Sequence, residues 1–176
     1  ANWVEPTSYA LLFLKKLRYW VTGSSKGPAG DWSDLKSIIV EGESLLRQRM
    51  CKEGGWNYGN ARVLGEELRP YPLTTAIALI ALQDQVSPEC QKSLAYLKRA
   101  APQERSALAL CMTAHCFSLY SIEAESCMRA ASALYHETRF FQNIKTSALA
   151  LLALRSLDGE SVFRLETSSQ GPKESK

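Results

Sequence analysis

The sequence contains few of the features that mark a membrane protein or a nucleic-acid-binding protein. Its apolar runs all stay below the roughly 18 residues that a membrane-spanning helix needs. The net charge is only +3, from 21 basic and 18 acidic residues, which is too small to indicate a nucleic-acid partner. Two short basic clusters are interpreted as solvated helix faces. They are Lys15, Lys16 and Arg18, and Lys98, Arg99 and Arg105.

The five cysteines are odd in number and include no Cys-x-x-Cys pair. They are Cys51, Cys90, Cys111, Cys116 and Cys127. Four of them fall inside or beside helical patterns, which is typical of reduced cysteine used as a small apolar residue in the cytoplasm. No charged leader precedes an apolar segment, and the chain starts with Ala1. We therefore expect a cytoplasmic protein, with membrane association left open, and a fragment or processed form of a longer chain.

No segment alternates apolar and polar residues for long enough to predict a strand, so we expect an all-α fold. Apolar residues at helical spacing predict seven helices. Six are expected at 9–20, 33–50, 73–83, 105–120, 121–136 and 143–157, and another follows the capping signal Ser87-Pro88-Glu89. Residues 1–157 are thus expected to form one repeat domain, and the polar residues 158–176 a disordered tail.

A dense run of glycines and aromatics, Gly54-Gly55-Trp56-Asn57-Tyr58-Gly59, separates two of these helices. Glycine permits backbone angles that are closed to other residues, so Gly54 and Gly55 are expected to end the preceding helix. Trp56 is expected to pack over neighbouring helix ends, and Tyr58 and Gly59 to lead into a long loop. We interpret this run as a structural turn of a helical-hairpin repeat.

The pattern Thr/Ser-x-x-Ala-Leu-x-x-Leu recurs at the start of every second predicted helix. The copies begin at Thr7, Thr75, Ser106 and Ser147, with spacings of 68, 31 and 41 residues, although Thr113 replaces the last leucine of the third copy. The helices between them are more amphipathic, which predicts two layers of alternating buried and solvent-facing helices. Such a stack forms a solenoid or closes into an α/α toroid, and the spacing alone does not decide between them.

These features together resemble the prenyltransferase and squalene-oxidase repeat family, which includes squalene–hopene cyclases, oxidosqualene cyclases and protein prenyltransferase β-subunits. The resemblance covers residues 3–157 and is carried mainly by Trp3-Val4-Glu5-Pro6-Thr7 and by the glycine–tryptophan run. It implies an α/α toroid, here a partial ring of about seven helices. It also implies an isoprenoid or other apolar ligand and, if the chain is an enzyme, cyclisation or transfer of an isoprenoid or triterpene.

The resemblance assigns no catalytic residue to this chain. The cyclases protonate their substrate with an Asp-x-Asp-Asp motif, which is not present; the nearest acidic pair, Asp31 and Asp34, is interpreted as a loop and a helix cap. The prenyltransferases hold zinc with Asp, Cys and His. Cys111 and His115 lie one helical turn apart and are weak candidates, with a third ligand from Glu123 or Cys127, but we favour a small apolar core helix. We expect no metal and no cofactor.

Aromatic residues gather at predicted helix starts and along the long loop, where they would form one rim of the toroid. The binding candidates are Trp3, Tyr9, Trp56, Tyr58 and Tyr71. Aromatic faces stabilise cations and pack against apolar ligands, although plain packing of these side chains is the interpretation we favour.

Two functions stay open at this point. The first is a cyclase-like or prenyltransferase-like domain without its own acid motif, and the alternative is a non-catalytic repeat module that binds a lipid or a protein. A partial ring would leave the apolar helix around residues 75–82 uncovered, so we expect self-association or a further chain that completes the ring.

Overall fold

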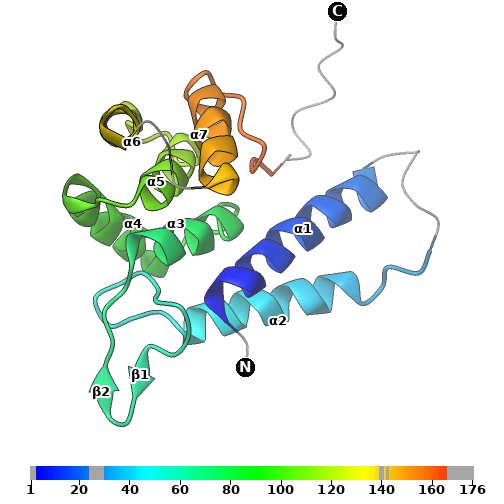
Figure 1. Ribbon diagram of the computed structural model, residues 1–176. Coiled ribbons are helices and arrows are strands. Elements are labelled where there is room, and N and C mark those ends of the chain that lie inside the picture. Colours follow the sequence, from blue (N-terminus) through cyan, green and yellow to red (C-terminus); the bar gives the residue numbers. More distant parts are fainter. Residues whose placement is uncertain (1–2, 24–29, 139–140, 142, 166–176) are drawn as a thin grey trace, which may run out of the picture.

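The computed structural model describes residues 3–23, 30–138, 141 and 143–165, and within them the protein is mainly helical (Figure 1). The helices are α1 (Val4–Gly23), α2 (Leu35–Gln48), α3 (Pro72–Ala81), α4 (Pro88–Ala100), α5 (Ala107–Leu119), α6 (Glu125–Thr138) and α7 (Ile144–Leu157), with a short 3-10 turn at Ala101–Gln103. Two strands, β1 (Arg62–Val63) and β2 (Glu66–Glu67), form the only sheet of the described part. The all-α prediction is confirmed.

The helices form two layers. Helix α3 packs between α1 and α5, and α5 packs in turn against α7, so the four odd-numbered helices make one layer. On its outer side α2 packs against α1, α4 against α3, and α6 against α5 and α7 (Figure 1). The alternation of the sequence repeat therefore corresponds to an alternation of layers.

The middle of the first layer is the best-covered part of the molecule. Every residue of α3 from Thr74 to Ala81 is buried, and so is every residue of α5 from Ala109 to Phe117. The alanines of both helices allow their neighbours to approach closely. The expectation that residues 75–82 would lack partners is wrong, because α1, α4 and α5 contact α3 within this same chain.

A segment that follows α7 also contacts this layer. Gln83 lies just beyond α3, and its side-chain amide donates a hydrogen bond to the carbonyl of Phe163 (2.8 Å) and accepts one from the amide of Leu165 (3.0 Å). Lys16 of α1 donates to the carbonyl of Val162 (2.7 Å), and the Phe163 ring packs edge-on against His115. Residues 162–165 thus contact these helices, in a segment where the sequence predicts a disordered tail over 158–176. Residues 166–176 lie outside the described part.

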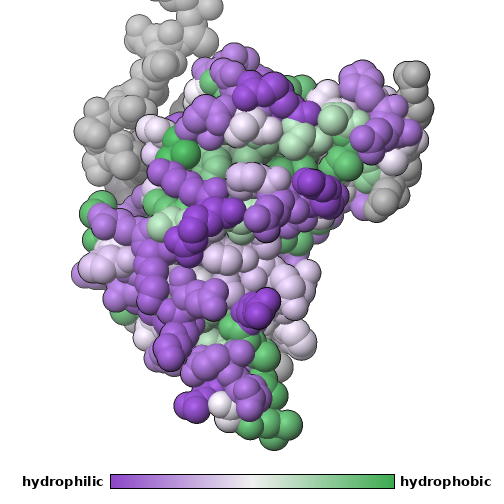
Figure 2. Space-filling view, turned by 90° about the vertical axis from the view of Figure 1, so that its left-hand side faces the viewer, coloured by the Kyte–Doolittle hydropathy of each residue, from purple (hydrophilic) through white to green (hydrophobic). Residues whose placement is uncertain are grey.

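The two strands, each of two residues, form a β-hairpin that extends from the loop between α2 and α3. Leu64 and Gly65 connect them with positive φ angles of 51° and 88°, which are favoured in tight hairpin turns. The hairpin lies at the lower end of the molecule (Figure 1). In the space-filling view, the surface at this lower end is partly apolar, whereas most of the face above it is polar (Figure 2). Leu64 at its tip is 99% exposed.

Candidate functional site

The glycine–tryptophan run forms a closed structural turn, here called the Trp56 turn (residues 51–57). The Trp56 amide donates to the hydroxyl of Thr75 (3.0 Å), and its indole Nε1 donates to the carbonyl of Leu46 (2.7 Å). The Trp56 carbonyl accepts from the Tyr71 amide (2.9 Å) and from the Thr74 hydroxyl (2.6 Å). The turn thereby joins the end of α2 to the start of α3.

Both glycines are required by the shape of this turn. Gly54 and Gly55 have φ angles of 89° and 77°. A Cβ on Gly55 would lie 2.6 Å from the Thr75 hydroxyl oxygen, and one on Gly54 would lie 2.9 Å from the carbonyl oxygen of Lys92 in α4. The Gly55 amide also donates to the Ser93 hydroxyl (2.8 Å). Gly54 and Gly55 thus have a structural role in the turn. The prediction that they end the preceding helix is wrong, because α2 already ends at Gln48, with Arg49 as its C-cap.

Immediately after the turn, the chain opens into a pocket of about 480 Å³, here called the aromatic pocket. Its wall combines three aromatic rings, two arginines and several small or apolar side chains. The lining residues are Trp3, Arg49, Asn57, Tyr58, Gly59, Asn60, Val63, Leu68, Arg69 and Tyr71. This volume is within the range of small-molecule sites, about 300–1,000 Å³.

Hydrogen bonds to the backbone position the segments that carry the aromatic rings of this pocket. The carbonyl of Tyr58 accepts a hydrogen bond from the Val4 amide at the start of α1 (3.0 Å), which brings Tyr58 next to Trp3. Tyr71 is the residue before α3, and its ring centroid lies 5.3 Å from that of Tyr58. The buried Asn57 side chain accepts from the Gly59 amide and donates to the Asn60 carbonyl, which holds the intervening backbone. The starts of α1 and α3 and the loop between α2 and α3 therefore build one wall.

The structure brings together three of the five aromatic candidates. Trp3, Tyr58 and Tyr71 line the pocket, and each is about half exposed. Trp56 is 1% exposed and belongs to the turn. Tyr9 lies half-buried in the first half of α1, and its burial and the nearby Glu5 carboxylate raise its pKa. Neither Trp56 nor Tyr9 lines this pocket.

Sequence reasoning missed the two arginines of the pocket. Arg49 follows the last residue of α2, and Arg69 lies in the stretch before α3. They are 20 positions apart and belong to no motif, so only the path of the loop brings them to the same wall.

The weak metal candidates on α5 lie in an apolar interior. Burial raises the pKa of the Cys111 thiol to about 11, whereas a metal ligand has to be a thiolate. Burial also lowers the pKa of His115 to about 4, and its Nε2 lies 3.2 Å from the Leu149 carbonyl oxygen. Among the described residues no three His, Cys, Asp or Glu side chains are grouped as metal ligands would be, so neither Glu123 nor Cys127 completes a set.

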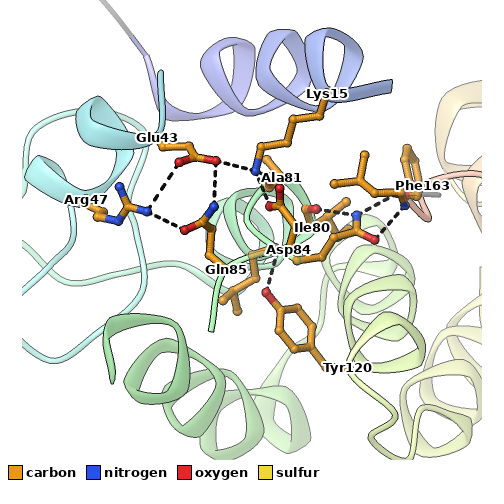
Figure 3. A network of polar contacts seen from close by, with 12 residues as sticks. Lys15, Glu43, Arg47, Ile80, Ala81, Asp84, Gln85, Tyr120 and Phe163 are labelled. Atoms are coloured by element: carbon orange, nitrogen blue, oxygen red, sulfur yellow. Dashed lines mark hydrogen bonds and ion pairs between the residues drawn. The ribbon is translucent and has the colours of Figure 1, made fainter. Parts of the chain in front are cut away.

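Apart from the pocket, a cluster of polar side chains connects α1, α2 and the end of α3 (Figure 3). The ammonium group of Lys15 lies 2.8 Å from a carboxylate oxygen of Glu43 and 2.9 Å from the Ala81 carbonyl, and it also pairs with Asp84. The interpretation of Lys15 as part of a solvated face is wrong, since the residue is 3% exposed. Its charge faces the negative end of α3 and two carboxylates, so the cluster is satisfied internally and holds three helices together.

Of the helices that the structure describes, none combines the length and the apolar character needed to cross a membrane.

The chain was compared with protein-family models, with curated protein sequences and with solved structures, and none of them matches it.

Proposed function

We propose that this chain is a toroid-type helical-repeat domain, similar to those of terpenoid cyclases and prenyltransferases, and that its aromatic pocket binds an apolar ligand such as an isoprenoid. One observation carries the proposal. Trp3, Tyr58 and Tyr71 come from three separate parts of the sequence and meet at one concave wall. Their exposed faces offer an apolar ligand a large contact area at low cost in side-chain entropy.

The proposed role of this pocket is binding and not acid catalysis. None of the described residues that line it is an aspartate, glutamate, cysteine or histidine. Asp31 and Asp34, the nearest pair to an acid motif, are both exposed and lie next to the start of α2. Cyclisation of an isoprenoid by protonation would therefore need an acid from elsewhere.

Calorimetric titration with farnesol, a 15-carbon isoprenoid alcohol, tests the proposal. We expect saturable binding that weakens at least about tenfold in Tyr58→Ala and in Tyr71→Ala, because each loses a ring that packs on the ligand. Tyr135→Ala is the matched control, since Tyr135 is similarly exposed but lies on α6. No saturable binding, or an equal loss in the control, would contradict the proposal.

A specific surface favours protein association as a second function. Three residues on one side of α7 are exposed although apolar: Ile144 (84%), Leu151 (66%) and Leu154 (50%). Helix α7 ends the row of odd-numbered helices, so a second copy or a further chain that packs there would extend the layer. Light scattering should then show association that Leu151→Glu abolishes. If the protein stays monomeric at every concentration, a second copy does not pack on this surface of α7.

A further inference from the structure

The aromatic pocket has two positively charged groups on its wall and no negative one. Arg49 is half-buried beside the Trp56 turn, and Arg69 is exposed. Within the described part of the chain, neither guanidinium has a carboxylate within ion-pair distance. Neighbouring arginines differ in this respect, because Arg47 pairs with Glu43 and Arg62 pairs with Glu67. The two arginines of the pocket are therefore available to a ligand.

The Asn57 side chain, which also lines the wall, is less suited to bind a charge. Both ends of the Asn57 amide are bonded within the loop. A guanidinium presents two parallel N–H groups, which match the two oxygens of a carboxylate or phosphate. Next to apolar walls, such an interaction is weakened less by water than on an open surface.

From this geometry we infer that the ligand of the aromatic pocket carries one anionic group, a carboxylate or a phosphate, on an apolar body. Arg49 and Arg69 bind the anion, while Trp3, Tyr58 and Tyr71 contact the apolar part. The inference rests on the proposed function, which concerns the apolar part alone, and adds the charge of the head group.

Three ligands that share one hydrocarbon chain test the inference: farnesol, farnesoic acid and farnesyl monophosphate. Each is titrated into the wild-type protein at low and high salt. We expect the acid, the phosphate or both to bind at least about tenfold more tightly than the alcohol, with the difference reduced by salt. Arg49→Gln and Arg69→Gln should each reduce this preference, measured as the ratio of anion affinity to farnesol affinity in the same variant.

Arg62→Gln is the matched control, because Arg62 is a charged residue of the same loop that does not line the pocket. If both anions bind no more tightly than farnesol, the inference fails while the proposed function stands. If no ligand binds, both fail. An equal loss of preference in Arg62→Gln would show attraction by general surface charge and would also overturn the inference. Because Arg49 is close to the Trp56 turn, the exposed Arg69 provides a variant in which folding is not at risk.

Discussion

Trp56 and Trp3 lie near the same loop but in opposite surroundings. Trp56 is 1% exposed and bonded through its amide, carbonyl and indole nitrogen, whereas Trp3 is 54% exposed and lines a pocket. Each tryptophan belongs to one of the two stretches that carry the resemblance to a repeat family. One stretch supplies a side chain of the framework, and the other supplies a side chain of the pocket surface, where we propose that a ligand binds.

The largest expected effect is on stability, and it should differ between two glycines that both have a positive φ, Gly55 and Gly65. Gly55→Ala should lower the free energy of unfolding by about 4 kcal/mol, because it combines left-handed strain with overpacking against Thr75. Gly65→Ala has similar strain, but its added Cβ would meet nothing within 4 Å, so about 1 kcal/mol is expected. Denaturant unfolding measures both. Equal effects would show that the Trp56 turn is not closely packed.

The second prediction concerns the pH dependence of stability. Burial lowers the pKa of His115 to about 4 in the folded protein, from 6.5 for an exposed histidine. Between pH 6.5 and 4 the unfolded chain therefore binds a proton that the folded protein does not. The free energy of unfolding should fall as the pH decreases through this window, by up to about 3 kcal/mol.

His115→Gln should remove this part of the pH dependence, and His136→Gln should keep it, since His136 is exposed on α6. An NMR titration of the His115 ring provides a direct check that needs no variant. A midpoint near 6.5 would contradict the buried environment of α5.

A smaller effect is expected from the indole hydrogen bond of the turn. Trp56→Phe removes the donor to the Leu46 carbonyl and should cost about 2 kcal/mol of stability, with the pocket preserved. Trp3→Phe, the counterpart at the pocket, should change stability by less than about 0.5 kcal/mol. Thermal unfolding of the two variants measures the difference. If Trp3→Phe lost more stability than Trp56→Phe, the assignment of Trp56 to the framework and of Trp3 to the surface would be wrong.

The smallest effect on stability is expected at the pocket tyrosines. Tyr58→Phe and Tyr71→Phe keep the rings and should leave the free energy of unfolding within about 0.5 kcal/mol of the wild type. Farnesol affinity should also stay within about threefold, because the contact is made by the ring faces. A loss of affinity as large as that expected for the alanine variants would show that the hydroxyl groups bind the ligand.

Local signals in the sequence predicted much of the helical framework. Ser87 accepts a hydrogen bond from the Cys90 amide at the start of α4, as its capping signal predicts, and Pro72 begins α3. The boundaries were less exact. Helix α2 begins at Leu35, and the Asp34 side chain makes no capping bond there, although the sequence predicts that Asp34 caps this helix.

Most of the features that the sequence did not predict depend on contacts between distant residues. Lys15 is buried because α2 and the end of α3 supply its partners. Residues 163 and 165 are fixed by Gln83, some 80 positions earlier. The two-residue strands are too short to show an alternating pattern. In the candidate site, the aromatic residues could be predicted from their positions near helix starts, but the arginines could not.

Mapping the farnesol site by NMR tests the central claim most directly. A titration followed through backbone amide and tryptophan indole signals should shift the resonances of Trp3, Tyr58 and Tyr71, with little change at the buried Trp56 indole. The account predicts saturable shifts confined to the aromatic pocket. Shifts centred on α7, or none at all, would contradict it.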